Sequence, residues 1–204
     1  MKATNVDAVK EFTAPARQKL ADALNRECTL EMPSGLVDEF ISFGTLLPLR
    51  RGERIISAGE VDDNLYIIER GIMRSWYHDG KREVTEAFGL PGTIVLSFHS
   101  YYDGQPSTVN FEACCPSRVL KVKRSDFDSL IERSHLFSRW CLRLAQCQLY
   151  HYEIRRRVIK GDGLGRYKAL LSHRPEIIRN VPLKIIASYL GVTPEYLSNL
   201  RKKV

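Results

Sequence analysis

The segment Leu183-Lys-Ile-Ile-Ala-Ser-Tyr-Leu-Gly-Val-Thr-Pro-Glu-Tyr-Leu-Ser-Asn-Leu-Arg-Lys202 has the pattern of two short helices joined by a turn. Ala187 lies where two crossing helices need a small side chain, and Gly191 lies where the turn needs a positive φ. Thr193 is a good N-cap, and Pro194 suits the first helical position because no N–H donor is needed there. The spacing predicts a helix-turn-helix, with an ordinary helical hairpin as the alternative. Its interhelical contacts would come from Ile186, Leu190, Val192, Leu197 and Leu200.

Positive charge is concentrated around this segment. Residues 151–204 contain 12 Lys and Arg against 4 Asp and Glu, whereas residues 1–150 contain 19 against 20. A basic terminal module on a neutral body is the charge distribution expected of nucleic-acid binding, because neutralising phosphates releases counterions. A solvated basic face is the alternative explanation.

The remaining composition excludes several classes of protein. The amino terminus lacks the apolar run of a signal peptide, and no segment approaches the roughly 20 apolar residues that span a membrane. We therefore expect a cytoplasmic protein without a membrane partner. No Cys-x-x-Cys pair occurs, so neither a zinc ribbon nor a disulfide framework is expected from the five cysteines, Cys28, Cys114, Cys115, Cys141 and Cys147.

The middle of the chain has an all-β texture. From residue 46 to residue 122, short apolar runs alternate with Gly, Pro, Asp and Asn at intervals of about ten residues. Asp79-Gly80 lies between two such runs and predicts a tight hairpin. Eight strands that close into a β-barrel or jelly roll are expected, at residues 46–49, 54–57, 64–69, 71–78, 81–88, 93–96, 108–113 and 117–123.

A long helical region follows at residues 125–160 and divides near Ser134. Apolar side chains recur three and four residues apart after this division, which is typical of a coiled-coil seam. The helix after Ser134 would measure roughly 40 Å. That is longer than is needed to cover one face of a small barrel, so dimerisation is the simplest explanation. A helix buried against its own barrel is the alternative. The predicted seam consists of Phe137, Trp140, Leu144, Cys147, His151, Ile154 and Val158.

Three glycines, Gly161, Gly163 and Gly165, interrupt the helical pattern and predict a hinge. The expected organisation is α+β: N-terminal helices and a β-barrel sensor at 1–124, a helical connector at 125–160, and the helix-turn-helix domain at 161–204.

In this order the parts resemble the Crp/Fnr family of bacterial transcription regulators. The resemblance covers about residues 36–204 and rests on Arg51-Gly-Glu53, Ala58-Gly-Glu60 and Asn64-Leu-Tyr-Ile-Ile-Glu-Arg-Gly71 in the barrel. The C-terminal motif is similar to that of Bacteroidetes-type members. The resemblance implies a homodimer that binds double-stranded DNA, works with RNA polymerase, senses a small-molecule effector and is not an enzyme.

Departures from the family pattern bear on the ligand. Gly92, Thr93, Ser107 and Thr108 match the family's phosphate-binding cassette, in which members that bind cyclic AMP carry Glu and Arg. A phosphate in a partly buried pocket needs a charged partner or several donors, so Ser107 in place of Arg argues against cyclic AMP. The effector is left unknown. Cys28 alone cannot supply an iron-sulfur cluster near the amino terminus, and none is expected.

The resemblance also assigns DNA contacts. Glu195 matches a base-reading position and can accept from a cytosine amino group, Asn199 can pair with adenine, and Pro194 can contact a thymine methyl. Basic side chains are expected on phosphates, which position the protein without specifying sequence. The motif ends without the β-hairpin wing of the family. The full predicted DNA-binding set is Lys184, Thr193, Pro194, Glu195, Tyr196, Ser198, Asn199, Arg201, Lys202 and Lys203.

Two other functions are alternatives to this one. A metal-dependent cupin needs two or three histidines and a carboxylate facing into the barrel, but the barrel region has only His78 and His99, without a His-x-His pair. A haem held through His78 is a related possibility. A ligand-independent regulator that acts through protein partners is compatible with Thr93 and Ser107 at the cassette.

Overall fold

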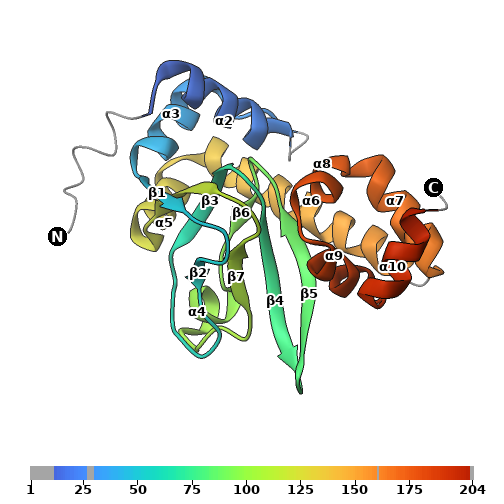
Figure 1. The fold of residues 1–204 in the computed structure, drawn as a ribbon. Helices are drawn as coiled ribbons and strands as arrows, with labels where there is room; N and C mark the ends of the chain where they lie inside the picture. The colour runs from blue at the N-terminus through green and yellow to red at the C-terminus, as the bar shows by residue number, and fades with distance from the viewer. Residues whose placement is uncertain (1–11, 27–29, 160, 203–204) are drawn as a thin grey trace.

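The computed structural model describes residues 12–26, 30–159 and 161–202 (Figure 1). Its strands are β1 (Thr45–Leu49), β2 (Arg54–Ile56), β3 (Leu65–Arg70), β4 (Met73–Asp79), β5 (Arg82–Gly89), β6 (Ile94–Val95), β7 (Asn110–Ala113) and β8 (Ser117–Val122). Its helices are α2 (Ala14–Arg26), α3 (Ser34–Ser42), α4 (Phe98–Asp103), α5 (Arg124–Arg133), α6 (His135–Ile159), α7 (Gly163–His173), α8 (Pro175–Asn180), α9 (Leu183–Leu190) and α10 (Pro194–Arg201).

The strands form two four-stranded sheets, with orders β1-β8-β3-β6 and β2-β7-β4-β5. A buried apolar layer that includes Ile68, Met73 and Val119 fills the space between them. The α+β class and the jelly-roll-like sandwich are confirmed. The closed barrel is wrong, because no described strand pairing joins one sheet to the other, and β5 is left at the edge of its sheet.

The hairpin predicted at Asp79-Gly80 is confirmed. β4 and β5 pair in antiparallel register down to Asp79 opposite Arg82, and Gly80 takes a φ of 58° in the turn. Glycine adopts this backbone conformation without the steric cost that a side chain would add. The hairpin extends beyond the rest of the sandwich at the lower edge of Figure 1.

The outer face of the β1-β8-β3-β6 sheet is covered by helices. Leu65, Ile67 and Leu120 share one buried cluster with side chains of α2, α3, α5 and α6. Phe40 of α3 contacts Phe137 of α6 with ring centroids 5.2 Å apart, in the edge-to-face geometry that aromatic pairs prefer. The start of α6 is therefore part of the core that covers this sheet.

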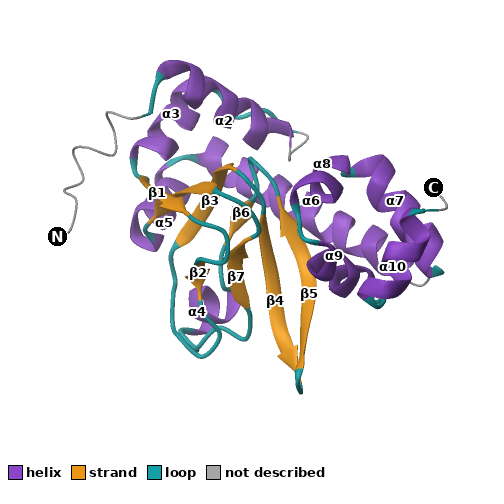
Figure 2. Ribbon diagram, viewed as in Figure 1, coloured by secondary structure: helices purple, strands orange, loops and turns teal. Residues whose placement is uncertain are grey.

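The four C-terminal helices pack together beside β5 (Figure 2). Ile72, Leu90 and Cys114 of the sandwich belong to the same buried cluster as the apolar residues of α7–α10. Burial raises the pKa of the Cys114 thiol to about 12, because a thiolate is disfavoured in apolar surroundings. The sandwich and the C-terminal helices thus share a core.

The segment predicted as a glycine hinge is shorter than expected. Helix α7 already begins at Gly163, and the side chain of Asp162 caps it by accepting from the N–H of Gly165 at 2.7 Å. A Cβ at Gly163 would lie 2.7 Å from the ring of Tyr196, so this glycine allows α7 to approach α10 closely. Within the described part of the chain, no helix has the length and apolarity to cross a membrane.

Candidate nucleic-acid interface

The predicted helix pair is confirmed as α9 and α10, joined by a three-residue turn. Gly191 adopts φ 64° and ψ 36°, and the next N–H, of Val192, donates to the carbonyl of Ala187 at 3.0 Å. This left-handed ending satisfies carbonyl groups that the end of a helix leaves without partners. Ala187 is fully buried where the two helices meet, as its small size predicted.

Helix α10 begins as the sequence predicted. Thr193 has extended backbone angles, and its hydroxyl accepts from the N–H of Tyr196 at 3.2 Å. Pro194 occupies the first turn, and Glu195 places a carboxylate near the positive end of the helix dipole. The cap and the proline fix the start of α10.

The side chains of α10 divide into a buried and an open face. Leu197 and Leu200 are buried against the other C-terminal helices. Glu195 and Asn199 are exposed, and with Pro194 and Ser198 they line one shallow hollow. The structure therefore brings together four of the residues that were predicted to contact DNA. Tyr196 is 47% exposed beside them.

The predicted phosphate contacts lie on the same helix pair. Lys184 of α9 is exposed, as are Arg201 and Lys202 at the end of α10. Lys203 lies outside the described residues.

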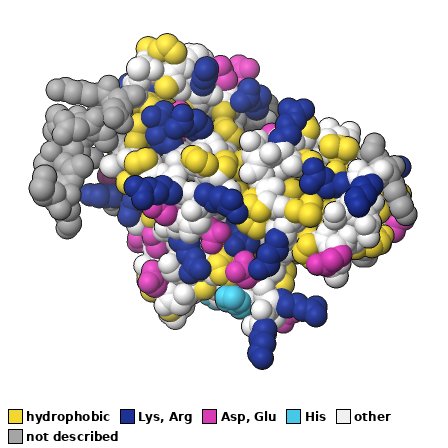
Figure 3. All heavy atoms as spheres, viewed as in Figure 1, with side chains coloured by type: hydrophobic (Ala, Val, Ile, Leu, Met, Phe, Trp, Pro, Cys, Tyr) yellow, Lys and Arg dark blue, Asp and Glu magenta, His cyan; other side chains and the backbone are white. Residues whose placement is uncertain are grey.

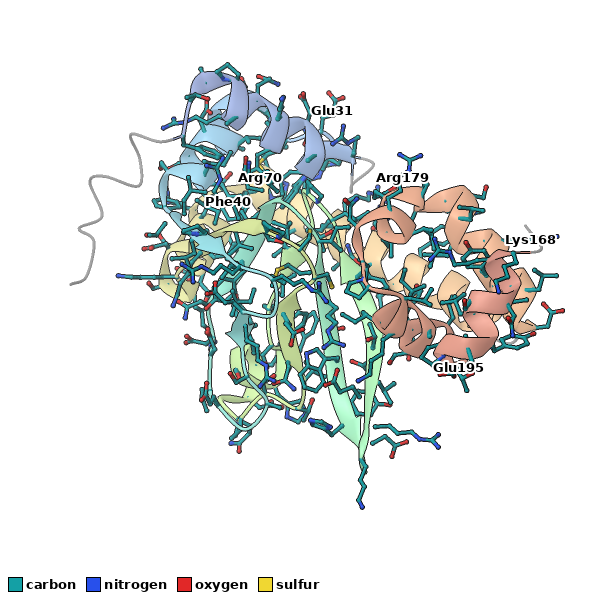
Figure 4. All side chains as sticks on the ribbon, in the orientation of Figure 1. Glu31, Phe40, Arg70, Lys168, Arg179 and Glu195 are labelled. Carbon is teal, nitrogen blue, oxygen red and sulfur yellow. The ribbon has the colours of Figure 1, made fainter. Side chains whose placement is uncertain are left out.

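Other basic side chains are more dispersed. Figure 4 shows Glu195 at the lower edge of the C-terminal helices and Arg179 at their upper edge, so Arg179 does not belong to the surface around Glu195. Figure 3 shows Lys and Arg side chains over the sandwich as well as over the C-terminal helices. The charge excess of residues 151–204 therefore does not form a separate patch in this view.

The four predicted cassette residues lie at the sandwich, and three of them are used within the fold. The Thr93 hydroxyl accepts from the N–H of Leu90 at 3.1 Å, and the Ser107 hydroxyl donates to the carbonyl of Val109 at 2.8 Å. Gly92 is buried under α2, and Thr108 is exposed. Residues 92–109, the cassette segment, contain no Lys or Arg. The segment therefore offers a phosphate neither a guanidinium nor an ammonium group.

A short helix in the cassette segment, α4, was missed by the sequence reasoning. Ser97 and Gly104 could have indicated this helix, because they are residue types that commonly begin and end helices. The Ser97 hydroxyl accepts from the N–H of Ser100, and Gly104 ends the helix in the left-handed conformation. Tyr101 of α4 donates a hydrogen bond to Asp128 of α5, and burial raises the pKa of Tyr101. The cassette segment is thereby attached to the helical connector.

The predicted dimer seam is wrong in its first half. Phe137 and Trp140 have no exposed surface, because they pack in the chain's own core, and Leu144 packs partly against the same cluster. Cys147 is half-buried. The side chains of His151, Ile154 and Val158 lie outside the described part of the structure. A helical repeat could not reveal whether its partner belonged to the same chain.

A different row of α6 side chains is open. Leu142, Leu149 and Tyr152 are 62%, 67% and 60% exposed, and Ala145 is exposed between them. The spacing of three and four residues places all of them on one side of the helix. We call these four residues the α6 stripe.

The two histidines that the cupin and haem alternatives required are both exposed. His78 lies on β4 with its ring against Trp76, at 5.0 Å between centroids, and His99 lies on α4.

A protein-family model matches the part of the chain that contains the sandwich. Residues 46–134 match the family model described as "Cyclic nucleotide-binding domain". The sandwich therefore has the fold of a cyclic nucleotide-binding domain, and we use that name for it. The sequence finds no match among curated proteins.

Solved structures extend the likeness beyond this domain. FixK2 from Bradyrhizobium japonicum aligns with a TM-score of 0.67 and 22% identity, over 78% of this chain and 83% of its own. The c-di-GMP-responsive global regulator CLP of Xanthomonas campestris aligns with a TM-score of 0.65 and 15% identity, over 84% and 91%. The catabolite activator protein of Thermus thermophilus aligns with a TM-score of 0.54 and 20% identity, over 89% and 85%.

The predicted resemblance to the Crp/Fnr regulators is confirmed, since the cyclic nucleotide-binding domain and these structural neighbours all point to that fold. The assignment to a Bacteroidetes-type branch stays a prediction.

Proposed function

We propose that the chain is a homodimeric, sequence-specific DNA-binding transcription regulator and not an enzyme. One observation carries the proposal: α10 exposes Glu195 and Asn199 around an open hollow while Leu197 and Leu200 hold its other face in the core. Exposed polar side chains on a helix with a fixed start are what major-groove recognition requires.

The chemistry of these side chains suggests how bases would be read. Glu195 accepts a hydrogen bond from the amino group of cytosine, Asn199 pairs with the N6 and N7 atoms of adenine, and Pro194 contacts a thymine methyl. Lys184 and Arg201, both exposed on this helix pair, would contact phosphates, which orients the helix without selecting sequence.

The α6 stripe supports the dimer in this proposal. Leu142 and Leu149 are seven residues apart, as are Ala145 and Tyr152, so two copies of α6 can pack along a coiled-coil seam. A two-fold dimer then presents two α10 helices to successive major grooves, about 34 Å apart.

The cyclic nucleotide-binding domain would supply regulation. The internal hydrogen bonds of Thr93 and Ser107, together with the absence of Lys and Arg from residues 92–109, favour an effector other than cyclic AMP. The same observations favour the second candidate, a ligand-independent regulator that acts through protein partners. RNA polymerase is the proposed partner in either case.

Selection of bound DNA from a random pool tests the proposal. The 204-residue chain is expected to enrich a near-palindrome whose half-sites lie one helical turn apart, at physiological salt. Enrichment of no sequence over the starting pool would contradict sequence-specific binding.

Leu149→Glu tests the dimer separately. A carboxylate in the seam loses apolar burial and must be desolvated, so the dimer dissociation constant should rise at least about tenfold. Sedimentation equilibrium measures this constant, and Arg139→Glu, an exposed change earlier on the same helix, is the control. An unchanged constant for Leu149→Glu would rule out the α6 stripe as the interface.

A further inference from the structure

The hydroxyl of Ser188 makes two hydrogen bonds between α9 and the edge of the cyclic nucleotide-binding domain. Ser188 donates from Oγ to the carbonyl of Glu83 at 2.7 Å and accepts at Oγ from the N–H of Thr85 at 2.9 Å. Both backbone groups belong to β5, the outer strand of its sheet. A serine hydroxyl has one proton to donate and lone pairs to accept, so it takes the place that a neighbouring strand would fill.

The β5 side of this contact is held in place. The Glu83 carboxylate pairs with the Arg74 guanidinium at 2.9 Å, and Arg74 also pairs with Glu112 of β7 at 3.0 Å. Arg74 is only 5% exposed at its side chain. Charge-assisted pairs with a buried guanidinium have defined geometry, so the strand presents the Glu83 carbonyl at a fixed position.

The α9 side is reinforced by the next residue. The ring of Tyr189 lies 4.9 Å from the ring of Phe88 on β5. Ala187 and Leu190, which flank Ser188 and Tyr189 in the chain, are buried in the core shared with the sandwich. The contact between α9 and β5 therefore combines hydrogen bonds, an aromatic pair and apolar burial.

The C-terminal helices are held by their chain connection and by their packing on the sandwich, which includes the contact at Ser188 and the shared buried cluster. The first is the chain itself, because α6 ends at Ile159 and α7 begins at Gly163. A short connection of this kind fixes a position but leaves rotation about it possible. The packing of α9 on β5, in which Ser188 takes part, restricts this rotation. Glu195 and Asn199 stay exposed in the attached arrangement.

We infer that Ser188 is a positioning residue that sets the spacing between DNA half-sites accepted by the dimer. It fixes the direction of α10 relative to β5 and, through the cyclic nucleotide-binding domain, relative to α6 of the proposed dimer. The inference rests on the proposed function. Because Ser188 points to β5 and not to the α10 surface, it acts on spacing and not on the identity of the bases.

The test compares Ser188→Ala with Ser188→Thr, which keeps a hydroxyl, and with Ser172→Ala, the same change at an exposed position of α7. Affinity is measured on the selected palindrome and on versions with one or two base pairs added or removed between half-sites. Hydrogen exchange of the Thr85 amide is followed in the free protein.

Ser188→Ala should accelerate exchange of the Thr85 amide about tenfold and reduce the preference for the selected spacing about tenfold, because one hydroxyl supplies both hydrogen bonds. The half-site sequence should not change. Ser188→Thr and Ser172→Ala should keep the wild-type values. A wild-type spacing preference retained in Ser188→Ala would overturn this inference and leave the proposed function intact. A wild-type chain without sequence-specific binding would overturn both, whatever the exchange result.

Discussion

The cassette segment and helix α10 contain similar polar side chains and use them in opposite ways. Ser107 is 3% exposed and its hydroxyl bonds the backbone of Val109, whereas Asn199 is exposed at an open surface. A polar group already satisfied inside the fold has little to gain from a ligand, while an exposed group can exchange water for a partner. The difference supports the proposal that α10 binds DNA and that the effector is not cyclic AMP.

The largest expected effect on stability comes from substituting glycines, one in the cassette segment and one in the turn that precedes α10. Gly92 has a φ of 96°, and a Cβ there would lie 2.5 Å from the backbone of Ala23, whereas a Cβ at Gly191 would have its nearest neighbour at 3.8 Å. Gly92→Ala should lower the free energy of unfolding by about 3 kcal/mol, because backbone strain and overpacking add. Gly191→Ala should cost only about 1 kcal/mol from strain.

Urea unfolding of both variants measures this difference. Equal losses in the two variants would show that α2 does not pack tightly on the cassette segment, and the contrast between the regions would weaken.

Ser107→Ala should have the next largest effect. The Ser107 hydroxyl donates to the carbonyl of Val109 and accepts from its N–H at 3.3 Å. Its removal should lower the free energy of unfolding by about 1–2 kcal/mol. Thr108→Ala, the neighbouring exposed position, should change it by less than about 0.5 kcal/mol. Thermal unfolding distinguishes the two, and a neutral Ser107→Ala would mean that the hydroxyl is available to a ligand.

Cyclic AMP should have no effect on stability. A ligand at 100 times its dissociation constant would stabilise the fold by about 2.7 kcal/mol. We expect no shift of the unfolding temperature at millimolar cyclic AMP, because residues 92–109 offer the phosphate no Lys or Arg. A concentration-dependent rise would contradict the assignment of these residues to internal structure.

Much of the fold could be predicted because its signals are local. The eight strands were located by apolar runs and turn residues, and α10 by Thr193 and Pro194. The sequence could not predict what the apolar face of α6 packs against. The spacing of Phe137 and Trp140 is the same for a contact with the chain's own core and for a dimer seam.

Part of the candidate site could also be predicted from the sequence. The exposed residues of α10 follow from the positions of its buried leucines, once the helix is placed. The role of Ser188 was not predictable, since its two hydrogen bonds reach residues 103 and 105 positions away in the chain. A hydroxyl on a helix surface has no local pattern that reveals such a partner.

The most direct test of base reading by α10 is to repeat the DNA selection with Glu195→Ala and Asn199→Ala. Both residues are exposed, so the variants should fold as the wild type does. Each should lose discrimination at one base pair of each half-site, by about 1–3 kcal/mol, while the rest of the selected sequence is kept. Selected sequences identical to those of the wild type would contradict the account.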